Sequence, residues 1–172
     1  MTEAFDSKEF RSALGNLPTG VVIVTGVDVS GEPLGVTIGS FVSISLDPPL
    51  VGFFQGLNSK TWPAIAVSGS FCANILAQDQ SELCWRFAKE AEGRFDGVQW
   101  TPATSGSPKI AGSLAHIDCT IESSSQVGDH LFIVGRVQNL EALAGSKSAM
   151  IFFKGAVTGT SQSSLVLFST LS

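Results

Sequence analysis

The chain has 172 residues, of which 44% are hydrophobic and only 15% are charged, and its net charge is −5. This length is typical of one domain with a substantial core, and an acidic balance without a basic cluster argues against a nucleic-acid partner. The sequence contains no apolar run of about 18 residues and no signal-like N-terminus, so we expect a soluble cytoplasmic protein without a membrane partner. Few charges are left to cover a monomer, which favours a homodimer with an apolar interface.

The three cysteines, Cys72, Cys84 and Cys119, are odd in number and far apart in the chain. They match neither a disulfide framework nor a zinc knuckle, and we expect buried, reduced thiols.

The N-terminal part predicts a short helix followed by a strand. Asp6 and Glu9 form a capping pair ahead of apolar residues at helical spacing, and Gly15-Asn16 and Pro18 end the helix. The β-branched run 21–27 predicts a buried strand, and Ser30-Gly31 marks the turn after it.

Residues 35–49 are expected to form one long central strand that Asp47-Pro48-Pro49 ends. One parity is apolar except at Ser40, and the other carries hydroxyls and glycines except at Phe41. A polar face thinned by glycine suits a flat polar ring lying close to the backbone. The same pattern also fits an antiparallel strand with a solvated face.

The rest of the chain predicts further short strands and two small helices. Helical turns are expected at 62–66 and from Asp79, with Glu82 in capping-box spacing, and 91–112 and 123–129 are expected as loops. Strands are expected at 50–54, 71–76, 114–122, 131–137 and 150–153. We predict one domain over 1–157, a barrel of six or seven strands, and a tail over 158–172.

Standard catalytic motifs are missing from the sequence. It has no Gly-x-Gly-x-x-Gly after a strand, no phosphate-binding P-loop and no Gly-x-Ser-x-Gly elbow. Only His116 and His130 are present, so a histidine-rich metal site is not expected, and His116 is assigned to the structure.

Three groups of residues remain as candidates for chemistry. Ser59-Lys60-Thr61 precedes a predicted helix start and could hold a phosphate or act as an ordinary cap. His130, after Gly128-Asp129, could bond a ligand or carry a proton, or it could be an exposed turn residue. Aromatic residues around a glycine-rich loop could cover a ring or belong to the core; these are Phe87, Phe95 beside Arg94, and Trp100.

Taken in order, a joint pattern over about residues 10–155 resembles the short-chain flavin reductase family, the small partners of two-component flavin monooxygenases. Its pieces are Phe10-Arg11-x-Ala13-Leu14-Gly15, Pro18-Thr19-Gly20-Val21, Thr37-x-x-Ser40-Phe41-x-Ser43-x-Ser45-Leu46-Asp47-Pro48-Pro49-Leu50-Val51, Ser59-x-Thr61, Phe71-x-x-Asn74-x-Leu76-x-x-x-Gln80, Arg94-Phe95, Gly128-Asp129-His130, Ile133-x-Gly135-x-Val137 and Phe153-Lys154-Gly155.

The resemblance implies a mainly β fold, a six-stranded antiparallel FMN-binding split barrel of Greek-key type with a few short helices, working as a homodimer. It implies an NAD(P)H:flavin oxidoreductase that transfers hydride from NADH or NADPH to FMN or FAD and delivers reduced flavin to a partner monooxygenase. Alternatives are a split-barrel oxidoreductase with tightly bound FMN, a non-catalytic flavin carrier, and an interaction domain without a ligand.

The resemblance also implies roles for individual residues. Ser59, Lys60 and Thr61 would bind the flavin phosphate, and Asn74 and Gln80 would lie at the edge of the site. Phe95 and His130 would lie on the nicotinamide side, with His130 as the catalytic candidate. The isoalloxazine would lie along Thr37, Ile38, Gly39, Ser40, Ser43 and Ser45.

The chain departs from the family pattern near its C-terminal end. Relatives often carry a Tyr-Phe-Arg-Gly-x-Tyr type of sequence where this chain has Phe152-Phe153-Lys154-Gly155-Ala156-Val157, and the chain has no tyrosine at all. A cofactor contact through a tyrosine hydroxyl is therefore not expected here.

Overall fold

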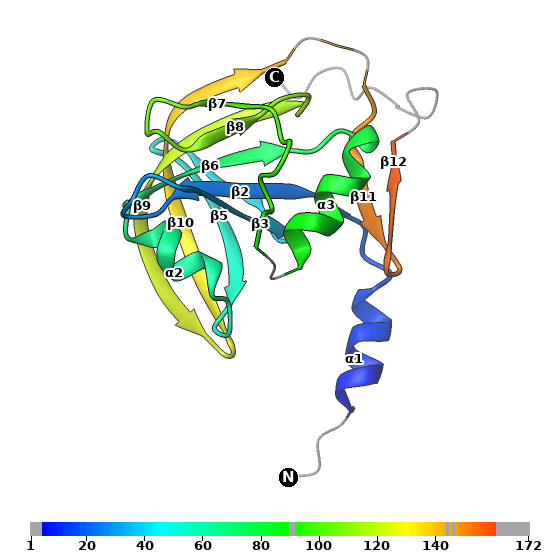
Figure 1. Cartoon of the computed structure of the whole chain (residues 1–172). Coiled ribbons are helices and arrows are strands. Elements are labelled where there is room, and N and C mark those ends of the chain that lie inside the picture. Colours follow the sequence, from blue (N-terminus) through cyan, green and yellow to red (C-terminus); the bar gives the residue numbers. More distant parts are fainter. Residues whose placement is uncertain (1–4, 90–91, 144, 146, 161–172) are drawn as a thin grey trace.

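The structure is a computed structural model that describes residues 5–89, 92–143, 145 and 147–160. It is mainly β, with a few short helices (Figure 1). The elements are α1 (Ser7–Leu14), β1 (Thr19–Gly20), β2 (Val22–Val27), β3 (Pro33–Ile38), β4 (Val42–Leu46), β5 (Pro49–Gly56), α2 (Thr61–Ala66), β6 (Ser70–Ile75), the 3₁₀ turn η1 (Gln78–Gln80), α3 (Ser81–Ala88), β7 (Trp100–Pro102), β8 (Pro108–Ile110), β9 (Ala115–Val127), β10 (His130–Ala142), β11 (Met150–Phe153) and β12 (Ala156–Gly159).

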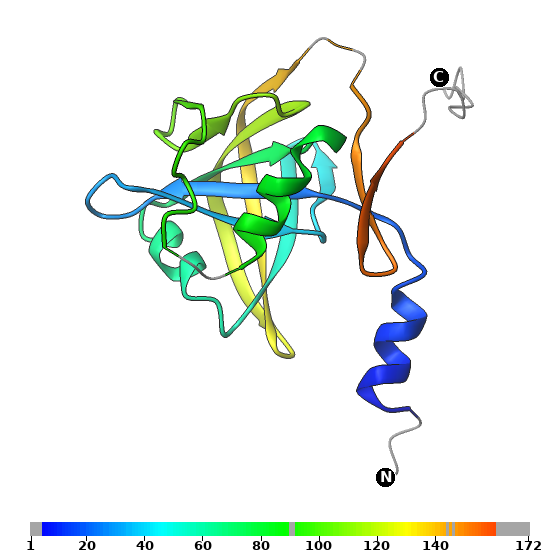
Figure 2. The same cartoon turned by 45° about the vertical axis from the view of Figure 1, so that its right-hand side comes forward.

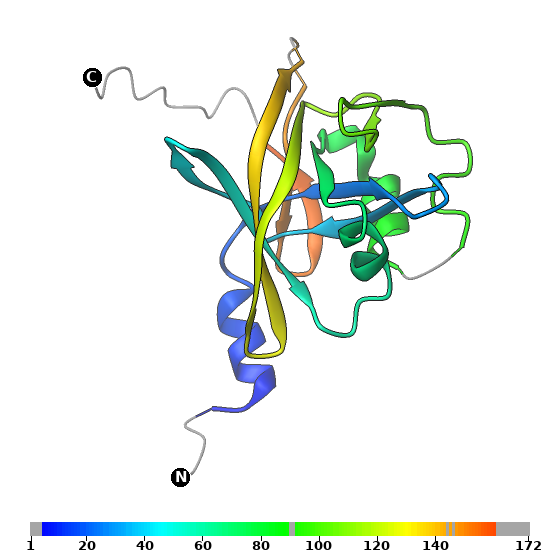
Figure 3. The same ribbon diagram turned by 90° about the vertical axis from the view of Figure 1, so that its left-hand side faces the viewer.

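Seven antiparallel strands form the main sheet, in the order β3-β2-β6-β9-β10-β5-β4. Seven strands agree with the six or seven predicted from the sequence pattern and are one more than the six that the resemblance implies. β3 and β4 lie at opposite edges of that order, yet only residues 39–41 join them. Four Cα steps reach at most about 15 Å, whereas the edges of a flat seven-stranded sheet lie about 29 Å apart. The sheet therefore curls into a barrel, seen from the side in Figure 3.

Ser40 closes this barrel across the gap between the two edges. Its Oγ accepts a hydrogen bond from the Phe54 amide at 2.9 Å and donates to the Phe54 carbonyl at 3.2 Å. The expected single strand over 35–49 is therefore wrong. The chain leaves the sheet at Gly39 and re-enters it at Val42, on the other edge.

The two halves of the expected central strand also differ in burial. In β3, Ile38 is 5% exposed, whereas in β4 Val42, Ile44 and Leu46 are 50%, 43% and 91% exposed. The apolar parity is thus buried only before the break, because β4 is an edge strand that extends beyond the barrel core.

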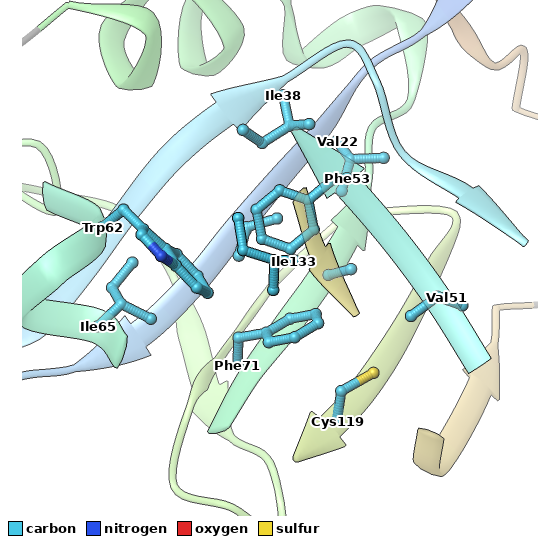
Figure 4. Packing of buried hydrophobic residues seen from close by; sticks show 11 residues of the cluster. Val22, Ile38, Val51, Phe53, Trp62, Ile65, Phe71, Cys119 and Ile133 are labelled. Atoms are coloured by element: carbon cyan, nitrogen blue, oxygen red, sulfur yellow. The ribbon is translucent and has the colours of Figure 1, made fainter. Parts of the chain in front are cut away.

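Aromatic rings fill the barrel (Figure 4). Phe53 packs edge-on against Trp62 at a centroid distance of 5.2 Å and against Phe71 at 5.4 Å. Ile65 and Ile133 are fully buried beside them. Trp62 and Ile65 are the buried side of α2, which confirms the helical turn expected there.

A second apolar cluster lies outside the barrel, under α3. Ile23, Leu76 and Phe87 are fully buried in it, and Met150 joins it from β11. β11 belongs to a separate three-stranded sheet, β1-β11-β12, seen beside the barrel in Figure 2. β12 reaches Gly159, just beyond the boundary expected at 157, and residues 161–172 of the expected tail lie outside the described part.

Several local predictions are confirmed and several are wrong. The capping box of Asp6 and Glu9 starts α1. The buried strand expected at 21–27 is present as β2, and the expected hairpin is formed by β9 and β10. The loop expected over 91–112 contains the β7–β8 hairpin, and β9 continues through the loop expected at 123–129. The capping box of Asp79 and Glu82 does not form: Asp79 accepts from Lys147, and Glu82 pairs with Arg86.

α1 has no buried residue and extends away from the barrel (Figure 1). The three cysteines are buried and free, as expected. Within the described ranges, no helix is long and apolar enough to cross a bilayer, and no group of three His, Cys, Asp or Glu side chains is arranged to hold a metal ion.

Candidate functional site

A cavity of about 630 Å³ lies between β3, the start of α2 and the segment 92–96. This volume is within the usual range for small-molecule sites. Its lining combines cationic, hydroxyl and aromatic groups with three carboxylates. The charged, hydroxyl and aromatic side chains of this lining are those of Glu32, Lys60, Thr61, Glu92, Arg94, Phe95 and Asp96.

Arg94 joins two walls of this cavity. Its Nη1 donates to the Gly35 carbonyl on β3 at 2.7 Å and to Thr61 Oγ1 on α2 at 2.8 Å. On the far side of the same segment, Arg86 of α3 donates to the Asp96 carbonyl at 2.9 Å. The segment is therefore fastened to the barrel on one side and to α3 on the other.

Phe95 supplies an aromatic surface whose orientation is fixed by packing. Its ring stands edge-on to the buried Phe87 at 4.9 Å and 88°, and edge-on to Trp100 at 6.2 Å. Phe87 itself lies against Gly35, where an added Cβ would come within 2.7 Å of its ring. This close approach explains the glycine on β3, and it seats α3 directly behind the cavity.

The structure brings three of the predicted residues together in this cavity: Lys60, Thr61 and Phe95. Ser59 directly precedes Lys60 in the chain, and its Oγ accepts a hydrogen bond from the Trp62 amide at 3.2 Å. Ser59 thus bonds one amide of the first turn of α2 from the position before the N-cap, Lys60, and its contact with a phosphate stays a prediction.

The residues predicted along a flat ring are divided between β3, the link and β4. Thr37 Oγ1 donates to the Cys84 carbonyl at 2.8 Å, and the Ile38 side chain is in the barrel core. Gly39 and Ser40 form the link, with the Ser40 hydroxyl bonded to Phe54. Ser43 is exposed on β4, and Ser45 is half-buried there.

Asn74 is fully buried and bonded on every side. Its Nδ2 donates to the Ile23 carbonyl and to Thr25 Oγ1, both at 3.0 Å, and its Oδ1 accepts from the Ile110 amide at 2.7 Å. The amide therefore ties the β7–β8 hairpin to the barrel, and its contact with a flavin stays a prediction.

Gln80 has a comparable linking role at the start of α3. Its Oε1 accepts from the Ala77 amide and its Nε2 donates to the Ala111 carbonyl, each at 3.0 Å. Only 8% of the residue is exposed. Its place at the edge of a ligand site likewise stays a prediction.

His130 lies at the start of β10, at the tip of the long hairpin. Its imidazole is about half exposed, and Nδ1 is 2.7 Å from Asp129 Oδ1. This hydrogen bond lowers the pKa of the Asp129 carboxyl below its ordinary value. The Asp129 carbonyl also accepts from the Leu57 amide at 3.1 Å, which ties the tip of the hairpin to the loop that leads from β5 to Ser59.

His116 is buried in β9, in agreement with the structural and non-catalytic role expected from the sequence. Its Nε2 donates to the Ile110 carbonyl at 2.9 Å, and its Nδ1 is 3.6 Å from Glu141. Glu141 accepts from Lys109 at 2.8 Å, and this bond lowers the pKa of the Glu141 carboxyl and raises that of Lys109.

Sequence reasoning missed the bonding role of Arg94. In the sequence, Arg94 stands out only as the neighbour of Phe95 in a glycine-rich loop. Its partners Gly35 and Thr61 lie 59 and 33 positions away, so no local pattern links them.

Comparison with known proteins agrees with this architecture. The family model described as flavin reductase like domain matches residues 14–161. Over 157 residues, the chain is 43% identical to a flavin-dependent monooxygenase reductase subunit of Rhodococcus jostii, covering 91% of this chain and 80% of that protein.

Two solved structures extend the comparison to the fold. Nitrilotriacetate monooxygenase component B from Mycobacterium thermoresistibile superposes with a TM-score of 0.92 at 40% identity, covering 98% of this chain and 94% of the other. The NADH:FAD oxidoreductase of Streptomyces globisporus gives a TM-score of 0.84 at 31% identity, with 94% and 97% covered. The match over nearly the whole chain, in sequence and in fold, makes this protein a member of the flavin reductase-like family.

Proposed function

We propose that this protein is an NAD(P)H:flavin oxidoreductase that reduces free FMN or FAD and delivers the reduced flavin to a separate monooxygenase. The observation that carries this proposal is the family match over residues 14–161, together with the 43% identity to a monooxygenase reductase subunit. The Streptomyces relative is named as an NADH:FAD enzyme. That name favours NADH as the donor here.

The cavity fits part of a dinucleotide or flavin nucleotide. It offers cationic groups from Lys60 and Arg94, a hydroxyl from Thr61 and an aromatic edge from Phe95. The chemistry is supplied by the bound molecules, because a nicotinamide donates hydride directly to a flavin. The chain needs only to bind the two rings, orient them in contact and exclude water.

We keep the predicted assignment of residues as part of the proposal. Lys60 and Thr61, with Ser59, would hold the flavin phosphate, and the exposed hydroxyl of Ser43 would meet the ring system together with the backbone of the link. Phe95 and His130 would contact the nicotinamide. The internal bonds of Asn74 and Gln80 favour a supporting role for those two residues.

A homodimer is the second part of the proposal. α1 buries none of its residues, and an isolated helix of eight residues is not stable in water. β4 exposes Val42, Ile44 and Leu46. A second copy covering these surfaces would explain both, and light scattering on a gel-filtered sample distinguishes a dimer from a monomer.

The first experiment is NADH oxidation with and without FMN, FAD or riboflavin, repeated with NADPH. Saturable turnover that depends on added flavin is expected. Flavin binding without turnover by either nicotinamide would favour the carrier alternative, and a purified protein that keeps a yellow flavin through dilution would favour tightly bound FMN. The expected cytoplasmic location is tested by cell fractionation.

A further inference from the structure

The bond between Arg94 and Thr61 fixes the direction in which the Thr61 hydroxyl can act. A guanidinium group only donates, so Thr61 Oγ1 is the acceptor in the 2.8 Å bond with Arg94 Nη1. The hydroxyl proton takes no part in that bond. Because Thr61 lines the cavity, this proton is available to an acceptor placed inside it.

The carboxylates around the cavity must be offset by cations if an anionic ligand is to bind, and Lys60 and Arg94 are the cationic side chains in its lining. The carboxylates of Glu32, Glu92 and Asp96 line the same space and repel a phosphate. Arg94 keeps its charge at every relevant pH and is held in place by two short hydrogen bonds.

The same side chain also sets the width of the cavity. By donating to the Gly35 carbonyl on β3 and to Thr61 on α2, it holds the segment 92–96 across both walls. Phe95 follows Arg94 in the chain. The position of the segment therefore determines how the Phe95 ring packs against Phe87. Loss of the guanidinium would release the wall that carries the aromatic surface.

We propose that Arg94 is a positioning residue for flavin phosphate binding, which holds Thr61 as a hydrogen-bond donor toward the phosphate and fixes the wall that carries Phe95. This inference rests on the proposed function, because it takes the flavin phosphate as the group bound near Thr61. The inference adds Arg94 to the phosphate site as the residue that orients the Thr61 hydroxyl.

The test compares FMN with riboflavin, which has the same ring system but no phosphate. In the Arg94→Met variant, the KM for FMN should rise on the order of tenfold, as expected for loss of one charge-assisted hydrogen bond, and the KM for NADH should rise as well, because the wall that carries Phe95 is released. Riboflavin should be affected far less. Equilibrium binding of FMN and riboflavin, followed by flavin fluorescence, gives the same comparison without turnover.

Three further variants separate positioning from a general loss of structure. Thr61→Val removes the donor, and if Arg94 acts through Thr61, the Arg94→Met/Thr61→Val double variant should bind FMN little more weakly than either single variant. Arg94→Lys keeps the charge and can still donate, but the ammonium lacks the planar guanidinium geometry, so it should recover part of the FMN affinity.

Arg86→Met is the matched control. Arg86 holds the other side of the same segment through the Asp96 carbonyl, and it does not line this cavity. Its loss should leave the ratio of FMN to riboflavin affinity unchanged, and melting temperatures of all variants are measured in parallel.

The outcomes distinguish the two levels of inference. If the wild-type protein neither binds nor reduces flavin, the proposed function is overturned. If wild type is active and Arg94→Met raises the KM for FMN and riboflavin equally, or Arg86→Met reproduces the FMN-selective loss, the role of Arg94 is overturned while the reductase stands.

Discussion

Ser40 bonds to both backbone polar atoms of Phe54, so a single hydroxyl joins the link between β3 and β4 to β5. The Ser40→Ala substitution should lower the free energy of unfolding by about 1–2 kcal/mol, because the two Phe54 groups lose their partner. Chemical denaturation measures this. Ser125→Ala, at the exposed end of β9, is the control and should have little effect; equal losses in both variants would contradict a closing role for Ser40.

Gly135 lies against the Phe71 ring in the barrel core. A Cβ at this position would come within 2.8 Å of Phe71 Cε1 and 3.2 Å of Cys119 Cβ. Gly135→Ala should therefore destabilise the protein by about 1–3 kcal/mol through overpacking. Gly20→Ala, where an added Cβ meets no atom within 4 Å, is the matched control in thermal unfolding. A Gly135→Ala melting temperature equal to that of wild type would mean that the ring moves aside freely.

The Lys109–Glu141 pair predicts a dependence of stability on pH. Bonding to Lys109 places the pKa of Glu141 below its ordinary value of 4.5 in the folded protein, so this contribution is present above that value and is lost as the pH falls through the lower folded pKa. The pKa of Lys109 is raised by the same bond, so its contribution is lost only as the pH rises through a folded pKa above 10.5.

Glu141→Gln should therefore lower the melting temperature near neutral pH, and the difference from wild type should shrink as the pH falls below 4.5. Lys109→Met should give a loss of the same sign, and the two losses should not add in the double variant. A difference between Glu141→Gln and wild type that stays constant down to strongly acidic pH would rule out the pair as its source.

The three thiols should be unreactive in the folded protein. Burial raises the pKa of Cys72 and Cys119 to about 12 and also raises that of Cys84. The thiolate is the reactive form, so a disulfide reagent at mildly alkaline pH should modify none of them until a denaturant is added. Rapid modification of one thiol in the native state would show that its part of the core opens easily.

His130→Ala should weaken the use of NADH more than the binding of flavin, as expected if the imidazole contacts the nicotinamide. The measurement is the KM for NADH at saturating flavin beside the dissociation constant for flavin. Asp129→Asn keeps the side-chain volume and weakens the contact with Nδ1, so a smaller change of the same kind is expected. Unchanged NADH kinetics in His130→Ala would exclude this residue from the site.

Local patterns predicted those elements whose residues are decided by their neighbours in the chain. The β-branched run of β2, the capping box of α1 and the hairpin around Gly128 depend on such short-range chemistry, and all are present. The break at residues 39–41 could not be read in this way. The two exceptions to the alternation, Ser40 and Phe41, lie within it, but the same alternation resumes at Val42, and only the pairing of β4 with β5 places the second half on the other edge.

The candidate site was predictable to the same degree. Lys60, Thr61 and Phe95 carry side chains typical of ligand contacts, and they meet in one cavity. The bonds of Asn74 and Arg94 depend on groups brought from distant strands, including backbone carbonyls that any residue could provide. A sequence pattern does not reveal which carbonyl a side chain will reach.

The strand order also bears on the route by which the chain folds. Three of the six pairings in the main sheet are local hairpins, whereas β2–β6, β6–β9 and β5–β10 join segments that are distant in sequence. β3 and β4 follow each other directly in the chain but do not pair with each other. Closure of the barrel therefore cannot start from a hairpin between these two strands. Each of the three long-range pairings requires a long loop to be closed, and the entropy lost in closing it precedes the stabilising contacts between the strands. The barrel therefore has the topology of a slow folder, and the exposed apolar strand β4 is added to it through β5.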